Sequence, residues 1–452
     1  MPSSQVTITG GTNTPTTAVP TNQPTPTLIP TQQAAQTVIP ATETAVLTPT
    51  ATPIPPTATP IFSGAPSPAC GQQLPILTTN ETSPIESLVP NETAVNDLKA
   101  IAPENTHAAL DYILAQPQNV SLVLYQLGNV ENGVFLNPDV SMPLASVAKL
   151  ITLAAYVEAV EAGQLNPDQQ VSLSKLEQYY LPNSDLGTHQ QAIRELEEEE
   201  RVVNESVALN DVAWMMIRHS SNAASDYLHL LLGQERIEET AVSLDLTQQT
   251  APCTFLSQFL AVSNHTRRGN AETAVRDYLN NPTLYGADAA LLADAFSQNE
   301  QFRQAELQWR NGRRQPNGAA QRLFNNHLNP QGTAREYAAL MGRFAQNGLG
   351  SGGSSFRARL LLEWPMQFGN NQLVFDNLGY KNGSLPGILT TAYYAYPKDS
   401  TVPVVITLFF RNLDNQTYRT WRFRTLPHDE LARWLLANPQ AISLLKAALN
   451  TK

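Results

Sequence analysis

Two side chains that can act as a nucleophile and its base lie three residues apart at the start of a long apolar stretch. Ser146 and Lys149 open the segment SVAKLITLAAYVEAVEAGQL, and residues at i and i+3 share one face of a helix. A serine hydroxyl is a poor nucleophile until a base takes its proton, and a lysine amine can be that base when burial or a nearby cation lowers its pKa. The pair therefore predicts acyl-transfer chemistry at Ser146.

The spacing of this pair is not specific by itself. Residues 172–175 and 443–446 are also Ser-x-x-Lys sequences. Such a match arises easily by chance, so the prediction depends on what else the chain contains.

Two further elements follow in a fixed order. Ser220 and Asn222 form a Ser-x-Asn directly after a predicted helix, although residues 297–299 repeat that pattern as well. Lys381 and Gly383 form the one Lys-x-Gly in a chain with seven lysines, and they come just before a predicted strand. A lysine at the end of a strand usually only contacts solvent. Together with the other two elements, however, Lys381 is interpreted as an anion-binding residue.

The three elements together resemble the penicillin-recognising serine enzymes, the class A β-lactamases and D,D-peptidases. The similarity extends to SVAKLITLAAYVEAVEAGQLNPDQQV (146–171), LNDVAWMMIRHSSNAASDYLHLLL (209–232) and TAREYA (333–338), and covers roughly residues 95–450 apart from an insertion. It implies an α+β fold with three layers (α/β/α), in which an antiparallel sheet is flanked by helices beside an all-helical subdomain.

The resemblance also implies roles for five catalytic residues. Ser146 would be the acylated nucleophile, and Lys149 would be its base, directly or through water. Ser220 would relay a proton to the leaving nitrogen, and Asn222 would hold the substrate amide and Lys149. Lys381 would attract a substrate carboxylate and lower the pKa of its neighbours.

Three substrate-binding residues, Asn382, Gly383 and Ser384, follow Lys381. The resemblance implies an oxyanion hole formed by the backbone N–H groups of Ser146 and Ser384. Asn382 stands where the family has Thr or Ser, so carboxylate recognition is expected to differ. Ser221 replaces the aspartate of the family's Ser-Asp-Asn, a position that is mainly structural there.

One element of the class A pattern is missing. The glutamate of a Glu-x-x-x-Asn loop, which activates the water that releases the acyl group, has no counterpart among the glutamates between residues 223 and 380. The sequence therefore predicts a serine hydrolase that acts on a β-lactam or a cell-wall peptide-like amide, with efficient β-lactam hydrolysis in doubt. Two alternatives are a slow or inactive penicillin- or peptidoglycan-binding module on a surface stalk, and a Ser–Lys esterase or amidase.

The periodicity of the apolar residues positions these elements. Alternating apolar residues and a high content of β-branched residues predict strands at both ends of the domain, with helices between them. The strands from the two ends would pair in one antiparallel sheet. The expected strands are 120–127, 134–136, 388–396 and 402–410. The expected helices are 92–116 with a break at Pro103, 145–162, 209–232, 333–347 and one that starts near His428.

The chain is predicted to consist of unlike parts. Just under half of residues 1–69 are Thr or Pro, a composition that cannot bury enough apolar surface to fold. We expect a disordered spacer there, a lead-in over 70–94, and a catalytic domain over 95–452 with an insertion at about 265–328.

Composition limits the partners. The net charge is −11 without a basic stripe, so nucleic acid is not an expected partner, and no apolar run is long enough to span a membrane. We expect a monomer with no cofactor and no metal. The Thr/Pro spacer favours an extracellular, cell-surface or periplasmic protein whose signal or anchor is lost or lies upstream, and there Cys70 and Cys253 could form a disulfide.

Several polar residues are predicted to have no role in catalysis. The acidic run 194–201 is interpreted as a solvated helix face, and His219 as a packing residue. Four arginines of the insertion are expected to be solvated rather than to border the cleft: Arg303, Arg310, Arg313 and Arg314.

Overall fold

The computed structural model describes residues 82–267, 269–311, 318–398 and 400–450. The predicted spacer and the two arginines Arg313 and Arg314 lie outside these residues. Cys70 does too, so its pairing with Cys253 stays a prediction, although Cys253 is buried and is not a free thiol.

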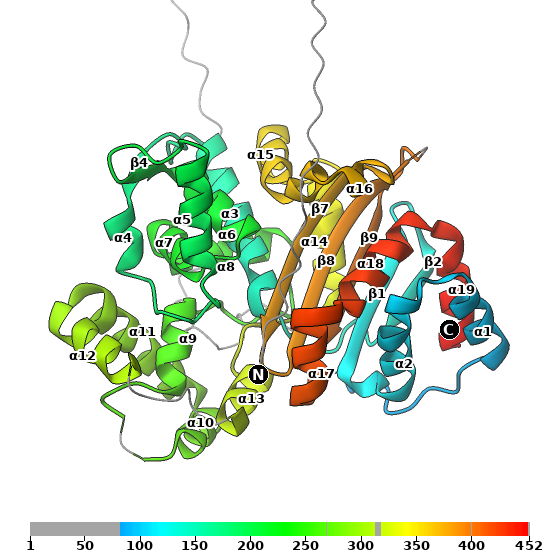
Figure 1. Cartoon of the computed structure of the whole chain (residues 1–452), viewed down its shortest axis with the longest axis horizontal. Helices are drawn as coiled ribbons and strands as arrows, with labels where there is room; N and C mark the ends of the chain where they lie inside the picture. The colour runs from blue at the N-terminus through cyan, green and yellow to red at the C-terminus, as the bar shows by residue number, and fades with distance from the viewer. Residues whose placement is uncertain (1–81, 268, 312–317, 399, 451–452) are drawn as a thin grey trace, which may run out of the picture. The chain divides into compact units, whose positions relative to one another are not determined.

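A five-stranded antiparallel sheet forms the centre of the described residues, with the strand order β2-β1-β9-β8-β7 (Figure 1). Strands from the beginning and the end of the domain lie side by side, which confirms the predicted α+β arrangement. The strands are β1 (Val120–Gln126), β2 (Asn129–Leu136), β7 (Phe375–Leu385), β8 (Ile388–Pro397) and β9 (Val404–Phe410).

Helices cover both faces of this sheet, because its central strands are apolar on both sides. In β1, Leu122 and Leu124 belong to one apolar cluster, whereas Val123 between them belongs to another. Successive side chains of a strand point to opposite faces, so the two clusters are the cores above and below the sheet. The result is the predicted three-layer α/β/α architecture.

One face is covered by helices from the two ends of the domain, among which α1 packs against α19 (Figure 1). The single terminal helix predicted from His428 is in fact two, because Asn438 separates them and Pro439 begins the second. The helices are α1 (Glu92–Ile101), α2 (His107–Ala115), α18 (Pro427–Ala437) and α19 (Pro439–Leu449). Helix α17 (Asn415–Thr420) and a single π-helical turn (Trp421–Thr425) come directly before α18.

The other face is covered by helices from the middle of the chain, centred on α3, in which all residues but Glu158 and Glu161 are buried. The helices are α3 (Lys149–Glu161), α4 (Leu173–Glu177), α5 (Thr188–Glu198), α6 (Leu209–Arg218), α7 (Asn222–Leu232), α8 (Gln234–Ser243), α14 (Ala334–Ala345), α15 (Gly352–Leu362) and the short α16 (Gly369–Gln372). Two short strand pairs accompany them: β3 (Met142–Pro143) with β6 (Gln331–Gly332), and β4 (Gln170–Ser172) with β5 (Ser206–Ala208).

A further block of helices, drawn in green to yellow at the lower left of Figure 1, has small apolar cores of its own. It contains α9 (Phe255–Val262), α10 (Ala271–Asn280), α11 (Pro282–Gln298), α12 (Glu300–Asn311) and α13 (Gly318–His327). Four of these five helices come from the stretch that the sequence analysis treats as an insertion. Every helix in the described part of the chain is too short or too polar to cross a membrane.

Two elements differ from the prediction where the motifs lie. The expected helix from Ala145 begins as a 3₁₀ turn (Ala145–Ala148), and Lys149 is the first residue of α3. The Lys-x-Gly element lies inside strand β7 rather than before the first C-terminal strand. The polar sequence FDNLGYKNGSL has a low strand propensity, but its ladder with β8 holds it in the sheet.

Candidate active site

The turn that carries Ser146 is held in a backbone conformation that is unusual for its sequence. Ala145 has φ 48°, a left-handed value that costs free energy in a residue with a Cβ. The N–H of Ala145 donates to Oδ1 of Asn329 at 2.8 Å, and the N–H of Leu144 donates to the Pro330 carbonyl at 2.9 Å. These bonds fix Ser146 at the entrance to α3, below strand β7.

Strand β7 approaches this turn so closely that only glycine fits. A Cβ on Gly383 would lie 2.6 Å from the backbone nitrogen of Ser146 and 2.5 Å from Oγ1 of Thr390. Residue 384 follows directly, so the backbone N–H groups of Ser146 and Ser384 belong to neighbouring segments. This close approach is what an oxyanion hole formed by the two groups requires.

Lys149 is 1% exposed, and its ammonium is surrounded by acceptors from the second element. Nζ donates to the carbonyl oxygen of Ser220 at 2.5 Å, to Oδ1 of Asn222 at 2.8 Å and to Oγ of Ser220 at 3.3 Å. Burial lowers the pKa of Lys149 to about 7, against the opposing effect of Asp185 and Asp226. Near neutral pH a substantial fraction of this amine is therefore unprotonated and able to accept a proton.

Ser220 interrupts the helical region that was predicted over 209–232. It lies between α6 and α7 with φ 59°, and Ser221 caps α7 by accepting the N–H of Ala224 at 3.1 Å. Asn222 begins α7, and its Nδ2 donates to the carbonyl of Ser184 at 3.3 Å. The break turns the Ser220 hydroxyl and the Asn222 amide toward Lys149.

Lys381 approaches the same hydroxyl from the sheet. Its Nζ donates to Oγ of Ser220 at 3.0 Å and to the carbonyl of Asn382 at 2.7 Å. Burial, with Lys149 and Arg422 nearby, holds the pKa of Lys381 well below its usual value. The Ser220 hydroxyl thus lies between two buried lysine amines, so it can pass a proton between one of them and a bound group.

A cavity of about 430 Å³ opens over these groups. Six of the eight predicted site residues line it, namely Ser146, Ser220, Asn222, Asn382, Gly383 and Ser384. The remaining two, Lys149 and Lys381, lie beneath its floor and reach it through Ser220. The structure therefore brings together all eight residues that the three elements predicted.

An aromatic ring lies beside the base, and it is part of the cavity wall. The ring centroid of Phe255 is 4.3 Å from Nζ of Lys149. The buried carboxylate of Asp226 accepts the N–H groups of Phe255 and Leu256, each at 2.7 Å, and so holds the first turn of α9. Burial raises the pKa of Asp226 to about 7. This packing places a side chain that cannot accept a proton next to Lys149.

Arg422 and Glu195 are two of the charged groups in the cavity that were not predicted from the sequence. Arg422, in the π-turn after α17, donates from Nε to Oγ of Ser384 at 2.9 Å and lines the cavity. Glu195 also lines it and pairs with Arg218 and, at 2.8 Å, with Nε2 of His219. The interpretation of the acidic run as a solvated face is therefore wrong for Glu195, because α5 turns this residue inward.

The sequence of the chain matches one known protein family. A sequence model of the beta-lactamase enzyme family matches residues 105–362, which is more than half of the chain. One similar solved structure is a beta-lactamase from Sphaerobacter thermophilus, with 15% sequence identity, 79% of this chain and 95% of that chain covered, and a TM-score of 0.40. A second is a beta-lactamase from Chitinophaga pinensis, with 14% identity, 80% of this chain and 99% of that chain covered, and a TM-score of 0.43. A third is PBP-A, with 14% identity, 82% of this chain and 99% of that chain covered, and a TM-score of 0.40. No curated protein matches the chain.

Proposed function

The chain belongs to the beta-lactamase enzyme family, and from this premise we propose that it is a serine hydrolase that is acylated at Ser146 by a β-lactam or a cell-wall peptide-like amide and releases the acyl group slowly. The observation that carries the proposal is the surroundings of Lys149. This amine is buried among Ser220 and Asn222, and on its other side it meets the ring of Phe255.

The first step of the proposed reaction is attack by Ser146. Its Oγ adds to the carbonyl carbon of the substrate while the unprotonated amine of Lys149 takes the hydroxyl proton. The backbone N–H groups of Ser146 and Ser384 stabilise the oxygen that becomes negative. A single donor of this kind typically contributes about 10²–10³ in rate.

The second step expels the amide nitrogen. The carbonyl re-forms, the C–N bond breaks, and the nitrogen takes the proton of the Ser220 hydroxyl, which is replaced by the proton held on Lys149. The distances from Ser220 Oγ to the two lysine amines, 3.3 Å and 3.0 Å, support this relay. The product is an ester on Ser146 and a free amine on the substrate.

Slow release follows from the absence of an obvious base for water. Lys149 would have to activate the water itself, since the neighbouring wall is the ring of Phe255. The carboxylates near the cavity are already engaged. Asp226 holds the N–H groups of α9, Asp185 accepts the N–H groups of Gly187 and Asn222, and Glu195 pairs with Arg218 and His219. Asp429 accepts the hydroxyl groups of Tyr380 and Thr391. This supports a penicillin-binding behaviour, in which the acyl-enzyme persists, over rapid penicillin hydrolysis.

The test is a time course of the full chain with an equimolar penicillin, followed by intact mass and by the loss of the β-lactam absorbance. We expect the protein to gain the mass of one penicillin and to keep it for many minutes, while little free hydrolysed penicillin appears. Rapid penicillin consumption with a short-lived adduct would overturn slow release. Absence of both an adduct and consumption would overturn the β-lactam reading and leave the ester or amide alternative.

A further inference from the structure

A small pocket adjoins the catalytic cavity, and it is built largely by helices whose role the sequence left open. We propose that this pocket binds a compact, uncharged, branched aliphatic group on the acyl part of the substrate. The proposal rests on the proposed function, because it concerns which substrates acylate Ser146. In this proposal, helices α12 and α13 limit the size of the substrate group that can bind.

The pocket and the cavity share walls. Phe255, Phe259 and Leu385 line both of them. Leu385 directly follows Ser384 in β7, and consecutive strand residues are about 3.3 Å apart. A side chain attached a few bonds from the carbonyl that binds at Ser384, such as the acyl group on the 6-amino nitrogen of a penicillin, can therefore extend past Leu385 into the pocket.

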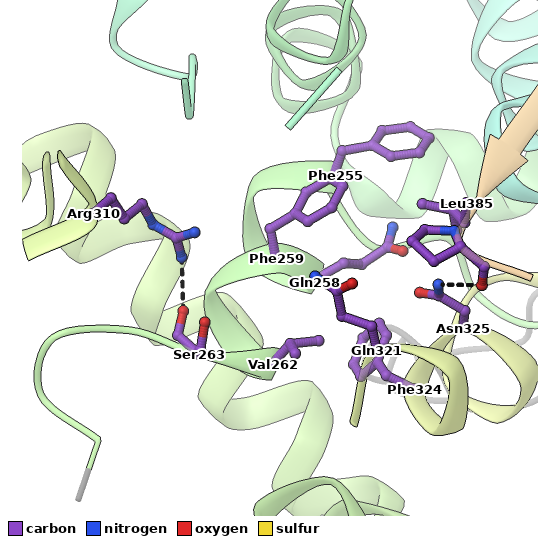
Figure 2. Close-up of a pocket in the computed structure, with 11 residues that line it drawn as sticks. Phe255, Gln258, Phe259, Val262, Ser263, Arg310, Gln321, Phe324, Asn325 and Leu385 are labelled. Carbon is purple, nitrogen blue, oxygen red and sulfur yellow. Dashed lines mark hydrogen bonds between the residues drawn. The ribbon is translucent and has the colours of Figure 1, made fainter. Parts of the chain in front are cut away.

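The pocket lies between two helices and a turn (Figure 2). One wall is formed by residues that share one face of α9, from Phe255 to Val262. The opposite wall is formed by Gln321 and Phe324 of α13. Asn325 of α13 donates from Nδ2 to the carbonyl of Pro386 at 3.2 Å, which ties α13 to the turn between β7 and β8. The chain itself therefore closes the pocket on the side of this turn.

Its volume sets the size of the group. The space is about 40 Å³, and a cavity needs roughly 10–15 Å³ by this measure for one water-sized group. About three heavy atoms fit, such as an isopropyl group, whereas a phenyl ring does not. Phenylalanine, valine, leucine and proline account for six of the eleven residues that line the pocket, so an apolar group is favoured.

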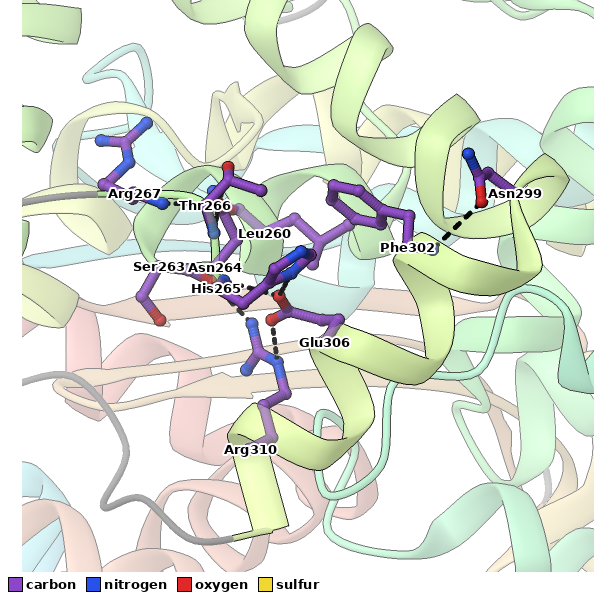
Figure 3. Close-up of polar contacts among 10 residues, drawn as sticks. All are labelled: Leu260, Ser263, Asn264, His265, Thr266, Arg267, Asn299, Phe302, Glu306 and Arg310. Atoms are coloured by element: carbon purple, nitrogen blue, oxygen red, sulfur yellow. Dashed lines mark hydrogen bonds and ion pairs between the residues drawn. The ribbon is translucent and has the colours of Figure 1, made fainter.

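A network of buried polar contacts fixes α12 at the edge of the pocket (Figure 3). Glu306 is fully buried and accepts the N–H and Nδ1 of His265, each at 2.7 Å, and Nε of Arg310 at 2.6 Å. Arg310 also donates to the carbonyl of Ser263 at 2.7 Å. The prediction that Arg310 is solvated is therefore wrong.

The same network favours an uncharged ligand over a charged one. Because the guanidinium of Arg310 is paired with the carboxylate of Glu306, its charge at the pocket edge is balanced. An anionic group would have to give up its hydration for a guanidinium whose charge Glu306 already balances, and a cationic group would meet that guanidinium. An uncharged aliphatic group has no such cost.

The experiment measures how fast the full chain is acylated by three penicillins that differ only in the acyl group on the 6-amino nitrogen: acetyl, isobutyryl and phenylacetyl. The rate constant for adduct formation is followed by intact mass. We expect isobutyryl to react about tenfold faster than acetyl, since two buried methyl groups are gained, and faster than phenylacetyl, whose ring exceeds the pocket.

Two variants change the pocket in opposite directions. Val262→Phe fills it, and should lower the isobutyryl rate to the acetyl rate while the acetyl rate stays within about twofold. Phe324→Leu enlarges it, and should raise the phenylacetyl rate relative to isobutyryl. Leu291→Phe adds the same bulk on α11, where Leu291 is 68% exposed, and should leave all three rates unchanged.

The outcomes separate this proposal from the function on which it rests. Equal rates for the three penicillins, or an unchanged preference in both pocket variants, would overturn the pocket while acylation itself stands. No adduct with any of the three would overturn the proposed function, and the pocket proposal with it. If Val262→Phe does not fold, the pocket is tested by Phe324→Leu alone, through the phenylacetyl rate relative to the isobutyryl rate.

Discussion

The ring of Phe255 lies against the ammonium of Lys149, with 4.3 Å between the ring centroid and Nζ. An aromatic face attracts a cation, so this contact favours the protonated lysine, whereas burial favours the neutral amine. The same ring removes room for a polar side chain beside the base. Burial thus supplies the neutral amine that the proposed acylation needs, and the Phe255 ring bears on the proposed slow release.

Phe255→Glu places a carboxylate where the ring now lies, next to Lys149 and in the wall of the cavity. A carboxylate there can take a proton from a water that attacks the ester on Ser146, and general base catalysis typically contributes about 10²–10⁴ in rate. We expect the lifetime of the penicillin adduct to shorten by at least about tenfold. The measurement is the decay of the adduct by intact mass after excess penicillin is removed.

The matched control is Phe255→Leu, which removes the ring without adding a base. Its adduct should persist as in the wild type. Equal shortening in both variants would mean that access of water, rather than a missing base, limits release.

The acylation rate should depend on pH through Lys149. The reactive form is the unprotonated amine, and burial lowers the pKa of Lys149 to about 7. Acylation should therefore rise about tenfold for each pH unit below 7 and level off above it. Rapid-mixing intact mass between pH 5 and pH 8.5 measures this profile.

Lys149→Arg keeps a cation but cannot supply a base, because an arginine stays protonated in proteins. This variant should show no measurable acylation at any of these pH values. A wild-type rate that is constant from pH 5 to pH 8 would rule out Lys149 as the base.

Gly383→Ala tests the close approach of β7 to the nucleophile. The new Cβ would lie 2.6 Å from the nitrogen of Ser146 and 2.8 Å from the carbonyl of Leu144, so the strand must move away. Displacing one oxyanion donor should lower the acylation rate by about 10²–10³. The comparison is with Gly352→Ala, where a Cβ meets no atom within 4 Å and acylation should be unchanged.

Arg422 is expected to bind the carboxylate that penicillins carry. It lines the cavity and donates to Oγ of Ser384, and a hydrogen bond to a charged group contributes about 1.5–3 kcal/mol. Arg422→Gln should therefore lower acylation by a penicillin by about 10- to 100-fold. Acylation by the methyl ester of the same penicillin, which lacks the charge, should change by less than about threefold, and an equal loss with both would show that Arg422 only supports Ser384.

The sequence could group the eight candidate site residues because the three elements occur together in the order that resembles a known family, although the spacing within the first two also occurs elsewhere in the chain. Ser146 and Lys149 share a turn, and the other elements come in a fixed order, so a linear pattern is enough to group them. The layered fold was predictable for a related reason, since the runs around Val123 and Phe409 are apolar on both faces and must be covered on both sides.

What the sequence could not predict depends on contacts across long separations. Phe255 reaches Lys149 because Asp226 holds the start of α9, and no local pattern encodes that bond. Glu195 lies in a run of acids that looks solvated, yet it faces Arg218 and His219. Strand β7 is polar enough to be missed, and its ladder with β8 is what makes it a strand.

The central claim is that Ser146 forms a lasting ester with the substrate. The most direct measurement is a peptide mass map of the full chain after incubation with a penicillin, with Ser146→Ala treated in parallel. We predict that the mass of the intact penicillin appears on the tryptic peptide that ends at Lys149, in the wild type alone. An adduct on another peptide, or one of equal yield in Ser146→Ala, would contradict the account.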